Sequence, residues 1–413
     1  MSGIAGLRGT GDWGTDERPK DFRESILFFS PNGDAPIFGL TAKAGKRSVS
    51  DPEFAWWAES NNIIRLQVNQ AGGYLSTDTT IVVDSADPTA STMGALYGTA
   101  THLKPGDLLL VEKTDQATFD NEIIMVDTVL SDTTFTVLRG QAGTTPAAIA
   151  DDTFLTLIGS SYAEGTSAPR AVAKNPIKFL NYIQIFKDSY EITGTADNTT
   201  ARTGSAWSND KKRKMFKHSA DIEWAIMFGR KNEATGENGK PIRFFGGLRE
   251  QIPASNTTVF SSATTAATFL NALQPAFDYD LGGGDTRMGF AGNLARVEMG
   301  KVIQGTTGIR MELGTVIKVY GQAFQEFITP LGRLLLKSHP LLSRHPRYNK
   351  SMFVVDFSAI KYVTMKGRPD GKVFDDVQAK DEDVRRGYIQ TDCSLMVDGG
   401  GLSQVYMGNI SAT

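Results

Sequence analysis

The stretch Ser208–Gly229 constrains the fold more than any other part of the chain, and its sequence is SNDKKRKMFKHSADIEWAIMFG. An α-helix turns by about 100° a residue, which places Met215, Ser219, Ile222 and Ile226 on one stripe. Such a stripe is typical of a helix with one buried side. The pattern therefore predicts a single long helix over residues 208–229.

Residues at both ends of this stretch favour helix boundaries. Ser208 or Asp210 can accept hydrogen bonds from backbone N–H groups that have no partner in the first turn. Gly229 suits the left-handed conformation that commonly follows a helix. Between these ends, the run Ile222–Phe228 is apolar around nearly the whole circumference, so we expect this half of the helix to be enclosed.

The first half of the predicted helix is basic, and it carries Lys211, Lys212, Arg213, Lys214 and Lys217. The i,i+4 pairs Asp210–Lys214 and Lys217–Asp221 are expected to neutralise part of this charge. Solvation is the ordinary role of such a basic face. The functional alternatives are contact with a phosphate backbone, or with the acidic cluster at 375–383 of an adjacent subunit.

Length and composition exclude several classes of protein. A chain of 413 residues is longer than one core usually serves, so we expect two or more lobes. Its net charge of −3 does not indicate a nucleic-acid-binding protein. The single cysteine, Cys393, cannot form an internal disulfide and fits a reducing compartment. The sequence has neither a secretion signal nor an apolar run long enough to span a membrane, so we expect no membrane partner.

Two adjacent tryptophans lie in the extended segment that begins at Glu53. Neighbouring side chains on a strand point to opposite faces, so Trp56 and Trp57 cannot share one core. The strand is either buried on both sides or is an arm that packs on a neighbouring subunit. Under the second interpretation Phe54, Trp56 and Trp57 are candidate subunit-interface residues.

Residues 92–160 are predicted to form a separate small β module. Its strands are apolar and β-rich with polar turns between them, over Leu108–Glu112, Glu122–Thr128, Thr134–Arg139 and Thr153–Ile158. The turn Arg139–Pro146 contains two glycines, and Arg139 can reach back to hold it. A phosphate loop is the alternative there, but no lysine follows and no helix begins, so we interpret it as a structural turn.

The remaining chain mixes strands and short helices. We predict a strand pair or bent strand over Asn175–Thr195, a helix over Thr264–Gln274, and a hairpin about Pro330. A final hairpin is predicted to join Arg385–Val397 to Leu402–Ile410. Long-range strand pairing around one long helix makes the fold class α+β.

Patterns that carry chemistry are missing from the sequence. Lysine follows glycine at four positions, but none is followed by the Ser or Thr that a P-loop needs. The four histidines are scattered, and there is no nucleophile-elbow motif. The acidic residues at 375–383 lack the glycine-punctuated spacing of a cation-binding loop. We therefore predict no catalytic, cofactor-binding or metal-binding residues, and no enzymatic activity.

Taken together, the chain resembles the major capsid proteins of tailed bacteriophages with the HK97 fold. The resemblance rests on Asp51–Trp56 (DPEFAW), Leu138–Thr144 (LRGQAGT), Asn181–Phe186 (NYIQIF), Ile192–Ala196 (ITGTA) and the predicted helix at 208–229, in that order. It is similar in particular to a subgroup with a β insertion in the E-loop region.

This resemblance implies a domain organisation over nearly the whole chain. It comprises an N-terminal arm over 1–40, an extended E-loop with its return strands over 41–75 and 161–204, an inserted β module over 76–160, a P-domain with the spine helix over 205–255 and 371–413, and an A-domain over 256–370.

The resemblance also implies a function. A capsid protein of this kind self-assembles into hexamers and pentamers that form an icosahedral shell around double-stranded DNA, which it contacts without sequence specificity. Its further partners are expected to be a portal and scaffolding or decoration proteins, and its location the virion capsid after assembly in the host cytoplasm. An encapsulin-like compartment and a tail or decoration protein are the alternatives, and an enzyme or binding module on an α+β scaffold is a third.

Overall fold

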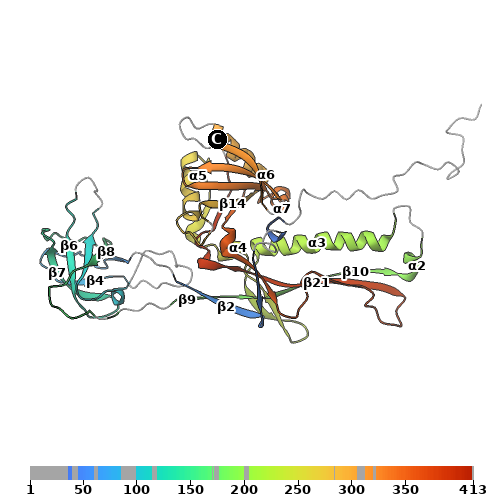
Figure 1. The fold of residues 1–413 in the computed structure, drawn as a ribbon, viewed down its shortest axis with the longest axis horizontal. Coiled ribbons are helices and arrows are strands. Elements are labelled where there is room, and N and C mark those ends of the chain that lie inside the picture. Colours follow the sequence, from blue (N-terminus) through green and yellow to red (C-terminus); the bar gives the residue numbers. More distant parts are fainter. Residues whose placement is uncertain are drawn as a thin grey trace, which may run out of the picture.

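The computed structural model describes residues 36–39, 45–59, 64–84, 99–113, 119–169, 171, 176–199, 204–282, 284–304, 312–319 and 322–411. The sequence also predicts a short amphipathic helix over Pro19–Phe29, and this segment lies outside these residues. The α+β class is confirmed, because one long helix accompanies several separate sheets (Figure 1).

The long helix α3 spans Ala206–Phe228, within two residues of the predicted range. Its N-cap is Ser205, whose side chain accepts a hydrogen bond from Ser208 N, so the predicted caps Ser208 and Asp210 were wrong. Gly229 ends the helix, but in an extended conformation (φ −55°, ψ 147°) rather than a left-handed one. A Cβ there would come within 2.5 Å of Ala225 O, so close backbone approach explains this glycine.

The helix α3 lies along two long strands, β10 (Gln184–Thr193) and β21 (Val384–Val397), as Figure 1 shows. These strands pair antiparallel over ten residues, and the sheet continues in the order β1-β19-β21-β10. The other strands of this sheet are β1 (Lys46–Val49), β19 (Ile360–Met365) and β20 (Lys372–Phe374). The buried half of α3 packs on this sheet through Ile222, Ile226 and Met227.

A second sheet has seven strands in the order β13-β22-β18-β14-β17-β16-β15. Its strands are β13 (Thr257–Val259), β14 (Thr286–Ala291), β15 (Glu312–Val319), β16 (Gln322–Thr329), β17 (Gly332–Ser338), β18 (Met352–Val355) and β22 (Val405–Gly408). Three helices accompany it, namely α5 (Ala266–Leu273), α6 (Asn293–Gln304) and α7 (Pro340–Arg344). The predicted hairpin about Pro330 is confirmed by the β16–β17 pairing.

The predicted C-terminal hairpin is wrong. The strand β21 pairs in the first sheet, whereas β22 pairs with β18 and β13 in the second. The turn between them contains Gly399 and Gly400 with positive φ angles of 65° and 62°, which redirect the chain from one sheet to the other. The last two strands therefore connect the first sheet to the seven-stranded sheet, and they do not form a hairpin within one sheet.

The β module is a small barrel. The predicted strands are confirmed as β5 (Asp107–Val111), β6 (Ile123–Val129), β7 (Thr134–Gln141) and β8 (Phe154–Ser160). Two shorter strands, β3 (Arg65–Gln67) and β4 (Thr80–Val82), complete the order β3-β8-β5-β6-β7-β4. A bridge between Val68 and Val83 joins the two outer strands, so the sheet closes on itself around an apolar interior.

The barrel begins earlier in the chain than the boundary predicted at residue 76, because β3 pairs with β8. The turn at Arg139 is the structural one predicted. The guanidinium group of Arg139 donates hydrogen bonds to the carboxylate of Glu122 and to the backbone carbonyls of Leu75, Asp78 and Ala147. One arginine thus ties three segments of the barrel together.

Two further strand pairs complete the fold. The strands β2 (Glu53–Ala58) and β9 (Ile177–Tyr182) pair antiparallel on the chain segments that lead to and from the barrel (Figure 1). After α3, β11 (Asn232–Thr235) and β12 (Pro241–Phe244) form a hairpin. The short helices α2 (Gly194–Asp197) and α4 (Leu248–Gln251) lie at turns of the chain.

Candidate assembly surfaces

The two tryptophans of β2 lie in different environments. Trp56 is 7% exposed and packs in a cluster of its own chain that includes Phe54, Phe179 and Met396. Trp57 is 62% exposed, opposite Lys178 in the strand register. Alternation along the strand, as predicted, separates the two rings.

This difference leaves Trp57 as the exposed residue among the three predicted subunit-interface residues. Phe54 and Trp56 are buried within the chain, so they need no neighbouring subunit to cover them. The interpretation of this strand as an arm whose rings are covered by a neighbouring subunit therefore does not hold for Trp56. The cross-strand stacking of Trp56 on Phe179, with centroids 5.9 Å apart, supplies the missing contact.

The basic half of α3 finds acidic partners within the same chain. Lys211 Nζ lies 2.5 Å from Asp375 Oδ2, and the hydroxyl of Tyr190 donates to the other oxygen of that carboxylate. The hydrogen bonds from Lys211 and Tyr190 hold the pKa of Asp375 below its ordinary value. Asp375 belongs to the acidic cluster at 375–383, which one alternative drawn from the sequence paired with these lysines between adjacent subunits.

A second group of charges lies further along α3. Lys217 Nζ lies 3.1 Å from Asp188 on β10 and 2.5 Å from Asp221, so the predicted i,i+4 pair is confirmed. The buried His218 places Nδ1 2.9 Å from Asp188 and Nε2 2.8 Å from Thr391 Oγ1. Burial opposes the charged form of Asp188, but hydrogen bonds from His218 and Lys217 outweigh it and keep its pKa below the ordinary value.

The other basic residues of this stretch behave differently. Asp210 pairs with Arg213 at 2.9 Å rather than with Lys214 as predicted. Lys212 is exposed, and no ion pair joins it to an acidic residue in the described part of the chain. Of the five cations of this stretch, Lys211, Arg213 and Lys217 are thus already paired within one chain.

Sequence reasoning missed a buried carboxylate on α3. Glu223 is fully buried within the stretch that was interpreted as apolar around its circumference. Its two oxygens accept hydrogen bonds from Ile37 N at 2.9 Å and Phe38 N at 2.7 Å, and His339 Nε2 lies 2.7 Å from Oε1. A glutamate inside an otherwise apolar helical run was the signal, because such a charge is buried only where partners meet it.

Groups with reactive potential are few among the described residues. No cluster of three His, Cys, Asp or Glu side chains there could hold a metal ion. Cys393 is buried, and burial raises the pKa of its thiol to about 12. No helix in the described ranges is long and apolar enough to cross a membrane.

Comparisons with known proteins match the chain over nearly its full length. The family model described as SU10 major capsid protein matches residues 7–399. The major capsid protein of Pseudomonas phage PaMx41 is 26% identical over 379 residues, covering 89% of this chain and 84% of that protein.

Solved structures of low sequence identity also align with the chain. The capsid of a native GTA particle aligns with a TM-score of 0.46 at 9% identity, over 98% of each chain. The capsid of cyanophage A-1(L) aligns with a TM-score of 0.43 at 10% identity, over 96% of this chain and 98% of that one.

Proposed function

The chain belongs to the SU10 major capsid protein family, and on that premise we propose how its copies meet and what they enclose. It is a phage major capsid protein with an HK97-type fold, its copies form a capsid shell, and its location is the virion capsid. The family match over residues 7–399 is the observation that carries this conclusion.

The alternatives drawn from the sequence are less well supported. Both the matched family and the relative from Pseudomonas phage PaMx41 are major capsid proteins, which favours a capsid over an encapsulin-like compartment. The same match favours a capsid over a tail or decoration protein.

The proposed domain organisation follows the observed elements. We assign α3, β10 and β21 to the P-domain and the seven-stranded sheet to the A-domain. The β2–β9 pair is the base of the E-loop, and the barrel is the module inserted in it. In this assignment β19 belongs to the P-domain and β22 to the A-domain, because strand pairing crosses the boundaries expected from the sequence.

The finer assembly is also proposed. Hexamers and pentamers of the chain build an icosahedral shell in the host cytoplasm, and the shell encloses double-stranded DNA. A portal and scaffolding or decoration proteins are its further partners. Support for these features comes from the capsid family, together with an elongated chain that leaves large apolar side chains such as Trp57 and Val316 exposed.

We propose Trp57 as the subunit-interface residue of β2. A 62% exposed tryptophan on a two-stranded ribbon is costly in water and contributes strongly when a neighbour covers it. Phe54 and Trp56 then act indirectly, because their packing on Phe179 fixes the strand that presents Trp57.

For the basic stretch we propose a weak contact with DNA centred on Lys212. Pairing between subunits through the 375–383 cluster is less well supported, because Asp375 already binds Lys211 of its own chain. A cation without an acidic partner in the described residues is free to meet phosphate, and such contacts are independent of base sequence and weaken with salt. Lys211, Arg213 and Lys217 contribute less because their charges are compensated.

We propose a purely structural role without catalysis. The described residues contain buried networks, such as His218 with Asp188 and Thr391, but these groups are satisfied by one another rather than aimed at a substrate. Pure protein is expected to show no ATP hydrolysis above a denatured control.

Electron microscopy of the purified chain tests the proposed function. Closed shells, or hexamers that close into shells when concentrated, are the expected result. Discrete monomers under all assembly conditions, with and without the candidate scaffold of the same phage, would overturn it.

A further inference from the structure

The segment around α7 is a strongly basic part of the chain. Residues 327–355 contain five cations and no acidic residue. These cations are Arg333, Lys337, Arg344, Arg347 and Lys350. Arg344 and Arg347 are exposed, and neither forms an ion pair with the described part of the chain. These two side chains therefore present uncompensated positive charge at the surface.

The turn that carries these two arginines is ordered by His345. His345 Nδ1 accepts hydrogen bonds from the backbone N–H groups of Arg347 at 3.1 Å and Tyr348 at 3.3 Å. The His345 ring packs on Trp224 of α3 with centroids 5.6 Å apart, and on Tyr348 at 4.6 Å. A turn that is held by both backbone and ring contacts has little entropy left to lose when its side chains bind a partner.

A third arginine approaches the same surface from α4. The guanidinium group of Arg249 lies 4.6 Å from the ring centroid of Tyr406, and a series of ring contacts links Tyr406 to Tyr348. Burial raises the pKa of the Tyr406 hydroxyl above its ordinary value, although the charges of Arg249 and Arg347 act to lower it. Since both charges act on one hydroxyl, Arg249 and Arg347 lie on the same part of the surface.

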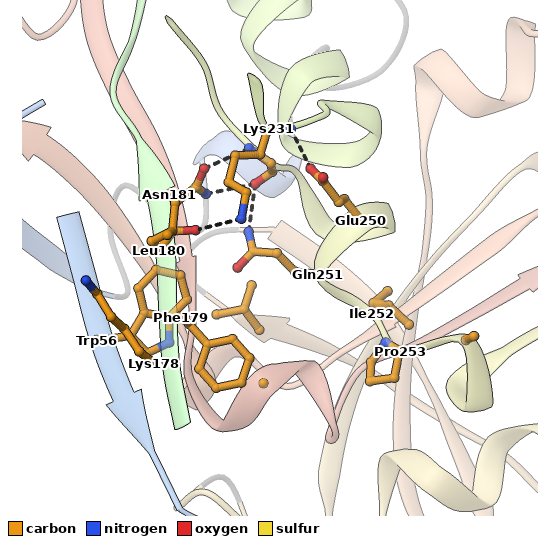
Figure 2. A pocket seen from close by; sticks show the side chains of 14 residues that line it. Trp56, Lys178, Phe179, Leu180, Asn181, Lys231, Glu250, Gln251, Ile252 and Pro253 are labelled. Carbon is orange, nitrogen blue, oxygen red and sulfur yellow. Dashed lines mark hydrogen bonds between the residues drawn. The ribbon is translucent and has the colours of Figure 1, made fainter. Parts of the chain in front are cut away.

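The acidic residue next to Arg249 in the sequence has another partner. Glu250 accepts a hydrogen bond from Lys231 N at 2.6 Å, beside the pocket between the β2–β9 pair and α4 (Figure 2). In the ranges that the structure describes, no acidic side chain pairs with Arg249. Arg249, Arg344 and Arg347 thus form a surface without a compensating carboxylate, which we call the arginine surface.

The arginine surface lies on the same side of α3 as Lys212. Lys212 and Glu223 are eleven residues apart, so at about 100° a residue their side chains point within about 20° of each other. Glu223 meets His339, the N-cap of α7, at 2.7 Å, and Figure 1 shows α7 beside the C-terminal end of α3. The strand β10 meets α3 on another side, where Asp188 contacts His218. One side of the molecule therefore carries both Lys212 and the arginine surface.

We propose that the arginine surface binds the phosphate backbone of the enclosed duplex DNA, with Lys212 at its margin. The inference rests on the proposed function, since a shell that encloses DNA presents one side of every subunit to it. Guanidinium groups bind phosphate oxygens through paired N–H donors, and they do so without reading the base sequence. An acidic segment of another protein is the competing partner, and assembly of empty shells distinguishes it from DNA.

Fluorescence anisotropy of a labelled duplex of mixed sequence, titrated with unassembled subunits at several NaCl concentrations, tests the proposal. The logarithm of the binding constant falls with the logarithm of the salt concentration, with a slope of about 0.9 for each phosphate neutralised. Arg344→Gln combined with Arg347→Gln should therefore make this slope shallower by about 1.8. Adding Lys212→Gln should remove about a further 0.9.

Two lysines outside the arginine surface provide the matched control. Lys187→Gln with Lys380→Gln removes the same charge from exposed residues that have no ion pair within the described segments. Lys187 lies between Phe186 and Asp188, whose side chains contact His218 of α3, so Lys187 points to the other face of the sheet. This variant should keep the wild-type slope. Urea unfolding should show wild-type stability for both variants, because no ion pair is lost in either.

Several outcomes would overturn the proposal. They are an unchanged slope for the arginine variant, an equal change in the lysine variant, and wild-type subunits that bind no duplex at low salt. Loss of empty shells by the arginine variant at an unchanged slope would identify a protein partner instead of DNA. Each of these results leaves the proposed function intact as long as wild-type chains form shells. Wild-type chains that form no shells would refute the proposed function itself.

Discussion

His339 Nε2 lies 2.7 Å from Glu223 Oε1, and both side chains are fully buried. Leu342 N donates to the other ring nitrogen of His339, so that nitrogen accepts and Nε2 carries the hydrogen that Glu223 receives. Glu223 also accepts from the backbone of Ile37 and Phe38. One carboxylate on α3 thus ties the start of the described chain to both lobes.

Glu223→Gln is expected to lower the free energy of unfolding by about 2–4 kcal/mol, because a carboxamide accepts at only one oxygen and turns an N–H₂ group toward a donor. Urea unfolding measures this loss, and hydrogen exchange at Ile37 and Phe38 should accelerate. Glu237→Gln, at an exposed position, is the control and should change stability by less than about 0.5 kcal/mol. Unchanged exchange at both amides would show that Glu223 does not hold this segment.

Adjacent tryptophans should give opposite phenotypes. Trp57→Ala is expected to leave the stability of the free subunit nearly unchanged and to weaken assembly by about 2–3 kcal/mol per contact, since an exposed ring contributes only when covered. Trp56→Ala should cost about 3–5 kcal/mol of subunit stability. Urea unfolding and sedimentation of shells separate the two effects. Wild-type shell yield from Trp57→Ala would remove this residue from the interface.

The two neighbouring lysines of α3 should respond differently to charge reversal. Lys211→Glu places two carboxylates together at Asp375 and should lower subunit stability by about 0.5–1 kcal/mol. Lys212→Glu should leave stability unchanged and reduce the salt-dependent retention of DNA by the shell. Empty shells should form with either variant. A loss of empty shells with Lys212→Glu alone would indicate that this lysine contacts another subunit.

The barrel should lose stability in acid. Burial opposes ionisation of Glu122, but hydrogen bonds from Arg139 and from Ala147 and Gly140 N outweigh it and lower its pKa. A lowered native pKa stabilises the fold above the unfolded pKa of about 4.3, and this stabilisation disappears as the pH falls through the native value.

Hydrogen exchange of barrel amides between about pH 5 and about pH 3, corrected for intrinsic rates, measures this loss. Glu122→Gln should be less stable at neutral pH, since it leaves Arg139 buried beside a neutral group, and should show a shallower pH dependence. Glu164→Gln, which is exposed, should follow the wild-type curve. An identical slope for Glu122→Gln would assign the acid sensitivity to other carboxylates.

Local features of the fold were predictable from the sequence by itself. The periodicity of apolar residues located α3 within two residues, and the four long strands of the barrel were found from β-rich runs between turns. The two glycines of the turn at Arg139–Pro146 suggested that the Arg139 side chain reaches back to hold the turn, and its hydrogen bonds to Leu75 O and Asp78 O agree with this. The chain's order of elements also pointed to the capsid family, which the match over residues 7–399 established.

Tertiary structure alone decided which segments meet. Alternation along β2 shows that Trp56 and Trp57 point apart, but only the approach of β9 and β21 determines which ring is buried. The same holds for Lys211 and Asp375, which are 164 residues apart, and for β21 and β22, which join different sheets across one glycine turn. The periodicity of apolar residues is set by neighbours in the sequence. Which strands pair and which charged side chains meet depends instead on how the whole chain buries its apolar surface.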